Sequence, residues 1–243
     1  MKIGVFGDIH ANLAALEAVL EALRDAGCET LVCTGDIVGY GASPAECIRL
    51  IRTHAIPCVL GNHDEYTTDI LGDQLTKLDP GTRATIEWAR KVVPLEDLRW
   101  LSSLPLKLEM EAFCVVHGSL GPQHWAYTVN RPNILEHFSH QKTLLSFNGH
   151  THLPLYCQMR ENSAPEMEFL KTTVLPNQGK ILVNPGSVGQ PRDRDPRSAC
   201  CVYDTMAGSV HPLRVPYDIA ATQALMRSAN LPERFIERIE VGR

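Results

Sequence analysis

The fold of this chain is decided by residues 2–36, which read KIGVFGDIHANLAALEAVLEALRDAGCETLVCTGD. Residues 3–6 form an apolar run typical of a buried strand, and leucines then recur at helical spacing over residues 13–23. Gly27 ends the helical pattern, and a second apolar run over residues 30–33 predicts another strand. The segment therefore predicts a strand, a helix and a strand.

The same alternation continues as far as residue 60. Residues 44–51 give a second helical pattern and residues 57–60 a third apolar run, so the chain begins in the order β-α-β-α-β. This order indicates a parallel sheet with crossover helices. Ligands of such open sheets gather beyond the carboxyl ends of the strands, and a polar motif follows each of the three runs.

Residues 65–104 differ from this pattern and predict a helical insertion with a break at Pro80-Gly81. The aromatic residues Trp88 and Trp100 lie at positions that suit core packing. The alternative is that the insertion forms a cap over a site and helps to select substrates.

The second half of the chain is rich in predicted strands and ends in helices. Residues 217–243 predict one or two terminal helices, with Pro232 in a first turn. No linker is apparent, so we expect one domain over residues 1–243. The strands are predicted at residues 106–109, 113–116, 143–147, 153–159, 167–170, 181–183, 199–204 and 210–215.

The composition is that of an ordinary globular protein, with 44% hydrophobic and 21% charged residues in a chain of 243. A net charge of -5 argues against a nucleic acid as the main partner, because such binders usually carry a basic face. The eight cysteines include no Cys-x-x-Cys pair and read as buried thiols in a reducing compartment. Neither a signal peptide nor a membrane span is recognisable, so we expect a cytoplasmic protein without a membrane partner.

Five short polar motifs each follow a predicted strand. Taken singly, Asp8 could be a helix cap, Asp36 a turn residue and the last histidine pair a surface feature. Taken together, carboxylate, imidazole and amide groups from separate strand ends could hold two divalent cations ~3.5–4 Å apart, the spacing that clamps a phosphoryl group. The motifs are Asp8-Ile9-His10, Gly35-Asp36, Gly61-Asn62-His63-Asp64, His117-Gly118 and Gly149-His150-Thr151-His152.

The third motif is the most specific of the five. The side-chain oxygen of Asn62 is a neutral metal ligand that could also face substrate. His63 could stay free of metal and give a proton to a leaving oxygen. We expect Asp64 to hold the His63 ring in the required orientation.

The ordered set of motifs resembles the calcineurin-like metallophosphoesterase superfamily, and more closely its small prokaryotic phosphodiesterase-like branch. The resemblance covers residues 2–203 and implies an α/β fold, a four-layer αββα sandwich of two packed sheets flanked by helices. It implies His63 as the acid, supported by Asp64. The resemblance also implies two ligand sets: Asp8, His10, Asp36 and His152 for one metal, and Asp36, Asn62, His117 and His150 for the other.

Two local features refine the branch. Phosphoprotein phosphatases of the superfamily carry Asp-Arg-Gly after the second motif and Glu after Asn-His, whereas this chain has Gly39-Tyr40-Gly41 and Asp64. The missing arginine, a phosphate clamp, makes protein-phosphatase and dinucleoside-tetraphosphatase activities less expected. Residues 184–193 resemble the closing loop of the small-phosphoesterase branch, and Arg192 in it either approaches the substrate phosphate or belongs to a simple turn at Pro185-Gly186.

These observations predict a dinuclear-metal-dependent phosphoesterase that acts on a small phosphate-ester substrate, most readily a phosphodiester, by attack of a metal-activated hydroxide. The alternatives are a phosphomonoesterase, a protein or dinucleotide phosphatase, or a noncatalytic interaction scaffold on the same fold. The mixed oxygen and nitrogen ligands suit Mn, Fe, Co, Ni or Zn, and the family resemblance favours Mn. The sequence does not indicate an oligomeric state.

Overall fold

The strand, helix and strand predicted from residues 2–36 are present in the structure, a computed structural model that describes residues 1–69 and 73–243. β1 (Lys2–Phe6) leads through α1 (Leu13–Asp25) to β2 (Thr30–Cys33), and β1 and β2 pair in parallel. The side chain of Asn12 caps α1 by accepting from the backbone N–H of Ala15, so Asp8 is not its cap.

The third predicted strand, residues 57–60, is wrong. Only a single bridge between Cys33 and Cys58 forms there. Pro57 has no backbone N–H to give to a ladder, and the N–H of Leu60 donates instead to the carbonyl of Pro105 at 2.8 Å. Residues 58–60 are buried, but the pairing ends after one residue.

The first sheet is mixed rather than parallel as predicted. Its strand order is β2-β1-β10-β11-β8, and every pair except β1 with β2 is antiparallel. The parallel prediction failed here because β10, a distant segment, takes the place beside β1. The remaining strands of this sheet are β8 (Thr173–Val174), which was not predicted, β10 (Ser198–Asp204) and β11 (Ser209–Val215).

The second sheet has the order β3-β4-β5-β9-β6-β7, in which β4, β5 and β9 are parallel to one another. Each of these strands was predicted to within a few residues. They are β3 (Lys107–Glu109), β4 (Phe113–Val116), β5 (Leu145–Phe147), β6 (Pro154–Met159), β7 (Glu166–Phe169) and β9 (Lys180–Pro185).

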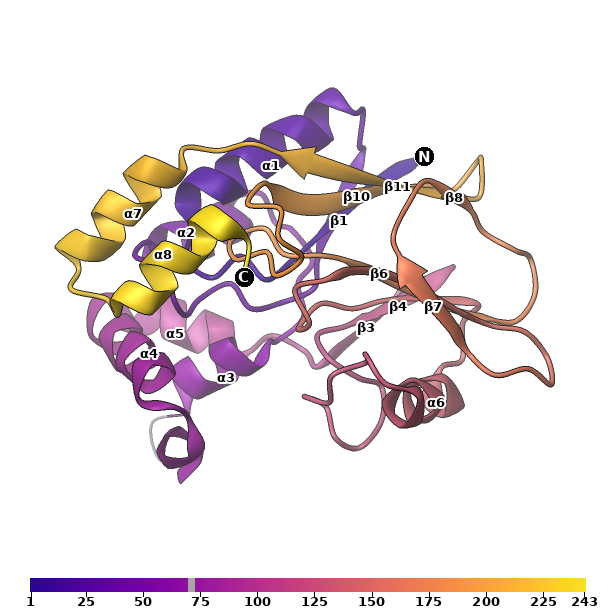
Figure 1. The fold of residues 1–243 in the computed structure, drawn as a ribbon, viewed down its shortest axis with the longest axis horizontal. Helices are drawn as coiled ribbons and strands as arrows, with labels where there is room; N and C mark the ends of the chain where they lie inside the picture. The colour runs from indigo at the N-terminus through magenta and orange to yellow at the C-terminus, as the bar shows by residue number, and fades with distance from the viewer. Residues whose placement is uncertain (70–72) are drawn as a thin grey trace.

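The two sheets pack face to face with helices outside them, which confirms the four-layer αββα sandwich (Figure 1). Val5 and Cys201 of the first sheet share a core cluster with Phe147 and Val183 of the second. α1 and α2 (Pro44–Thr53) cover the outer face of the first sheet. α6 (Arg131–His140) covers the outer face of the second and was not predicted.

The region expected as a helical insertion contains α3 (Asn62–Thr68), a short 3-10 helix (Asp73–Lys77), α4 (Pro80–Val92) and α5 (Leu95–Ser102). α3 begins inside the third motif, earlier than expected. Trp100 packs against the cluster that contains α1 and α2, and Trp88 packs beside Tyr40, so both tryptophans contribute to cores.

The predicted terminal helices are α7 (Ile219–Ser228) and α8 (Glu233–Val241), and Pro232 precedes α8. Phe235 and Ile239 of α8 pack in one cluster with Tyr40, which brings the chain end to the loops that follow β1, β2 and β9 (Figure 1). All eight cysteines are free thiols, and seven are buried as expected. Among residues 1–69 and 73–243, every helix is too short or too polar to cross a membrane.

Candidate metal centre

The polar motifs converge where the two sheets end on the same side of the molecule. Asp8 and His10 follow β1, Asp36 follows β2, and His117 follows β4. His150 and His152 follow β5, whereas Asn62 and His63 stand on the first turn of α3. All of these side chains are buried.

A left-handed backbone aims several of these side chains at one point. Such a conformation costs an ordinary residue about 1–2 kcal/mol. It allows residues two apart in a loop, such as Asp8 and His10, to face the same centre. Packing of the surrounding loops must outweigh this strain, which is typical of functional sites. The residues with positive φ are Asp8 (49°), His10 (50°), Asp36 (53°), His150 (68°) and His152 (59°).

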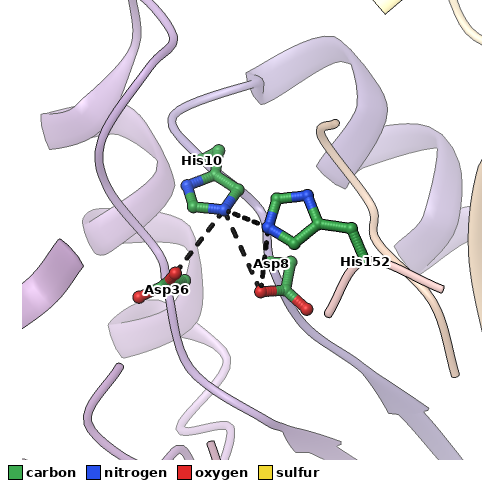
Figure 2. A group of neighbouring side chains, drawn as sticks. All are labelled: Asp8, His10, Asp36 and His152. Atoms are coloured by element: carbon green, nitrogen blue, oxygen red, sulfur yellow. Dashed lines mark hydrogen bonds and ion pairs between the residues drawn. The ribbon is translucent and has the colours of Figure 1, made fainter. Parts of the chain in front are cut away.

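The first cluster consists of Asp8, His10, Asp36 and His152, whose potential ligand atoms lie within 4.8 Å of one another (Figure 2). The Nε2 atoms of His10 and His152 are 3.0 Å apart. Nε2 of His152 is 3.4 Å from Oδ1 of Asp8, and Nε2 of His10 is 3.5 Å from Oδ2 of Asp36.

The tautomers of both histidines are fixed by main-chain carbonyls. Nδ1 of His10 donates to the oxygen of Val38 at 3.1 Å, and Nδ1 of His152 donates to that of Gln190 at 2.6 Å. A carbonyl can only accept, so in a neutral ring each Nε2 carries a lone pair that points inward. Burial holds the pKa of both rings well below the usual range. Two facing lone pairs beside Asp8 and Asp36 fit a divalent cation.

The second cluster consists of Asp36, His117 and His150, with Asn62 beside them. Nδ1 of His117 donates to the oxygen of Thr34 at 2.8 Å, so its Nε2 faces Oδ1 of Asn62 at 3.1 Å and Oδ2 of Asp36 at 3.3 Å. His150 has the opposite tautomer, because its Nε2 donates to the oxygen of Trp125 at 3.0 Å. These second contacts orient ligands in the manner common to metal-binding histidines.

One oxygen of Asp36 joins the two clusters. Oδ2 faces both His10 and His117, while Oδ1 accepts the backbone N–H of His63 at 2.8 Å. Oδ2 is thus the oxygen that faces histidines of both clusters. The predicted ligand set is thus gathered into two groups that share one atom, and its donors fit two divalent cations.

The charges of the site follow from burial and from its one strong ion pair. Burial raises the pKa of Asp8 to about 7. Burial acts the same way on Asp36, but the His117 charge outweighs it and holds the pKa of Asp36 below its usual range. Burial would lower the pKa of His117, yet the Asp36 charge raises it to about 10. A cation at this position competes with the proton on His117, because an imidazole must be deprotonated to bind metal.

His63 lies beside the clusters with its ring packed between aromatic groups. Its centroid is 4.4 Å from that of Tyr40 and 4.8 Å from that of His10. Burial lowers the pKa of His63 to about 4. Its Nδ1 is buried and has no hydrogen-bond partner among the described residues.

The expected contact between Asp64 and the ring of His63 is wrong. Oδ1 of Asp64 accepts the backbone N–H groups of Ile37 and Val38 at 2.9 and 3.1 Å, and Oδ2 accepts that of Gly61 at 3.0 Å. The carboxylate turns back to the start of α3, where orphan N–H groups attract it. It therefore ties the second motif to the third instead of holding His63.

The position of His63 depends on Gly39, whose importance was not evident from the sequence. A Cβ on Gly39, whose φ is 88°, would lie 2.4 Å from Nδ1 of His63. Only glycine leaves room for the ring there. Glycine on both sides of Tyr40 was a visible signal, but its physical meaning needed the packing of α3.

Arg192 lies in the loop after β9 and near the first cluster. Its Nη2 donates to Oε1 of Gln190 at 3.2 Å, and its Nε is buried without an acceptor among the described residues. The backbone N–H of Arg192 donates to the main-chain oxygen of His152 at 3.3 Å, so the arginine adjoins the first cluster. Burial and then the Arg192 charge lower the pKa of His152.

Comparison with known proteins agrees with this geometry. A family model for the calcineurin-like phosphoesterase superfamily domain matches residues 1–207. A metallophosphoesterase crystal structure from Sphaerobacter thermophilus has 39% sequence identity, covers all of both chains and superposes with a TM-score of 0.85.

Two curated relatives extend the comparison. An uncharacterized protein of Methanocaldococcus jannaschii is 36% identical over 99% of this chain and 98% of its own length. Phosphodiesterase YfcE of Escherichia coli K12 is 26% identical over 82% of this chain and 85% of its own.

Proposed function

Because the chain belongs to the calcineurin-like phosphoesterase superfamily, we propose that it hydrolyses phosphodiesters with two divalent metal ions. The observation that carries the proposal is the pair of donor clusters that share Oδ2 of Asp36. The YfcE relative, a phosphodiesterase, supports the diester over the monoester.

Seven residues would hold the ions. Asp8, His10, Asp36 and His152 form one set, and Asp36, Asn62, His117 and His150 form the other. Bound divalent ions would supply activation of water and neutralisation of phosphoryl oxygens. Manganese is our first choice among Mn, Fe, Co, Ni and Zn, on the basis of the family resemblance.

The remaining groups bind the substrate and move a proton. His63 is the acid for the departing oxygen. Its low pKa keeps it neutral until an anionic phosphate beside it raises that pKa. Arg192 offers its free Nε to the phosphate, and Asp64 fixes the loop of Asp36 against α3.

The helical segment over residues 65–104 is proposed as the substrate-selecting cap. Glu65 accepts from Nε1 of Trp125 at 3.0 Å, which joins α3 to the loop beside His150. Tyr66 lies 6.1 Å from His63 between ring centroids. An intact ligand set together with His63 favours an enzyme over a noncatalytic scaffold.

The test is metal-dependent hydrolysis of bis(p-nitrophenyl) phosphate. Chelator-treated protein should lose activity and regain it with one of the five metals, and metal analysis should find two ions per chain. Asp36→Asn should lose both ions and activity, whereas Asp25→Asn, an exposed position on α1, should behave like the parent. Full activity in verified metal-free protein would refute the proposal.

A further inference from the structure

Two arginines from distant parts of the chain meet beside the proposed metal centre. Arg192 lies in the loop after β9, and Arg238 lies on α8, outside the residues that the family model matches. Nη2 of Arg192 and Nη1 of Arg238 each donate to Oε1 of Gln190 at 3.2 Å. The two guanidinium groups are therefore separated at these atoms by no more than twice that distance.

No Asp or Glu carboxylate of the described residues lies within ion-pair distance of either guanidinium. The acidic neighbour Asp193 is instead paired with Arg214, and Arg234, one turn before Arg238, is paired with Asp79. Arg238 otherwise donates Nε to the main-chain oxygen of Arg243. Burial and then the Arg192 charge lower the pKa of Arg238, as expected for two uncompensated like charges.

The same place has donors without acceptors. Nε of Arg192 and Nε2 of Gln190 are both buried and lack a hydrogen-bond partner among residues 1–69 and 73–243. Buried donors are normally satisfied. Since Nε of Arg192 is proposed above for the scissile phosphate, a second group that only accepts and carries negative charge, such as a further phosphate, would satisfy Nε2 of Gln190 and neutralise the guanidinium pair.

The pair joins the wall of the metal centre to α8. The main-chain oxygen of Gln190 accepts from His152, so this loop is part of the wall of the first cluster. Arg238 reaches the side chain of the same Gln190 from α8, the helix whose Phe235 packs 4.7 Å from Tyr40. An anion held by Arg238 would therefore sit beside a phosphate held at the metal centre and not replace it.

We propose that Arg192 and Arg238 form a second anion site, which selects phosphoesters that carry a further phosphate group next to the one that is cleaved. This inference rests on the proposed function. The substrate class it names is a nucleotide-like ester with two or more linked phosphates, and Arg238 is its specificity-determining residue.

The test compares p-nitrophenyl esters of AMP and ADP, which differ by one phosphate and both release p-nitrophenol. With free metal held constant, the wild type should favour the ADP ester in kcat/KM. Arg238→Gln should reduce the ratio of the two kcat/KM values by roughly 10- to 100-fold, the usual loss of one charged hydrogen bond. Arg238→Lys keeps the positive charge but loses the two-pronged guanidinium, so its ratio of kcat/KM values should lie between those of the wild type and Arg238→Gln. The matched control Arg227→Gln, an exposed position on α7, should keep the wild-type ratio.

A merely structural effect of Arg238 would lower both rates together and leave the ratio unchanged, and that result would overturn the inference. Equal use of the two esters by the wild type would overturn it as well. If the wild type hydrolyses neither ester but does hydrolyse bis(p-nitrophenyl) phosphate, the proposed function stands and calorimetry with ADP and AMP decides the anion site alone. If it hydrolyses none of the three with any of the five metals, the proposed function fails, and the same calorimetry still decides the anion site. At least tenfold weaker ADP binding in Arg238→Gln, with the AMP change smaller, supports it. Equal weakening contradicts it.

Discussion

Gly39→Ala should separate the role of His63 from that of the metal ligands. The new Cβ would lie 2.4 Å from Nδ1 and 2.9 Å from Cγ of His63, so the ring must move. The positive φ of 88° adds about 1–2 kcal/mol of backbone strain, and overpacking adds about 1–3 kcal/mol. The expected loss of stability is the sum of both, or about 2–5 kcal/mol.

The catalytic effect should depend on the leaving group. Displacement of an acid by about an ångström costs on the order of 100-fold in rate, but p-nitrophenolate departs with little need of a proton. Gly39→Ala should therefore lose roughly 100-fold in kcat on an alkyl diester and much less on bis(p-nitrophenyl) phosphate. Its metal content should stay at the wild-type value.

Gly27→Ala is the matched control for the backbone. Gly27 has a φ of 78°, but a Cβ there would meet no atom within 4 Å. Gly27→Ala should lose stability through backbone strain but keep the wild-type kcat on the alkyl diester. Equal losses on both substrates by Gly39→Ala, or a wild-type rate on the alkyl diester, would refute the assignment of His63.

Four further outcomes are expected. Arg192→Ala should reduce kcat/KM for a diester by roughly 10- to 100-fold through loss of a charged contact, and unchanged kinetic constants would contradict its role. Manganese at 100 times its dissociation constant should stabilise the chelator-treated protein by about 3 kcal/mol per site, which thermal unfolding would detect and Asp36→Asn should abolish. His137 lies on the buried face of α6 and forms a hydrogen bond with Ser146, and burial lowers its pKa from 6.5 to about 4. Its neutral form therefore stabilises the fold above pH 6.5, and that contribution is lost as the pH falls toward 4. Urea unfolding with chelator present should then show His137→Gln losing about 2–3 kcal/mol less than the wild type between pH 7.5 and 4.5; equal losses would count against it. Phe235→Ala should lower the free energy of unfolding by about 3–5 kcal/mol, because the ring is buried against Tyr40. If denaturant unfolding shows no loss of stability in this variant, α8 does not support the site.

The convergence of the proposed ligand motifs could be predicted because each motif is local. An apolar run followed at once by Asp8 or His117 places the side chain at a strand end whatever the rest of the fold does. Sheet order could not be predicted in this way. β10 pairs with β1 across some two hundred residues of sequence, and the residue pattern within a strand does not indicate which other strand lies beside it.

Other failures also have local physical causes. Residues 57–60 have the composition of a strand, but the missing N–H of Pro57 and the carbonyl of Pro105 decide their pairing. α6 has few apolar positions, although Asn130 as its cap and Pro132 in its first turn were signals for it. Asp64 was assigned to the nearest ring, whereas the N–H groups of Ile37 and Val38, distant in sequence, bind it.

The place of β10 inside the first sheet has a consequence for synthesis on the ribosome. The last proposed ligand, His152, is translated well before Ser198–Asp204, the strand that lies between β1 and β11. A nascent chain that ends between residues 152 and 198 carries every proposed ligand. It lacks β10, the strand that pairs with β1 just before the Asp8 loop. Since pairing across such sequence separations is slow, we expect the centre to assemble only after β10 has emerged from the ribosome and paired with β1. Metal capture would then follow this pairing rather than the synthesis of His152.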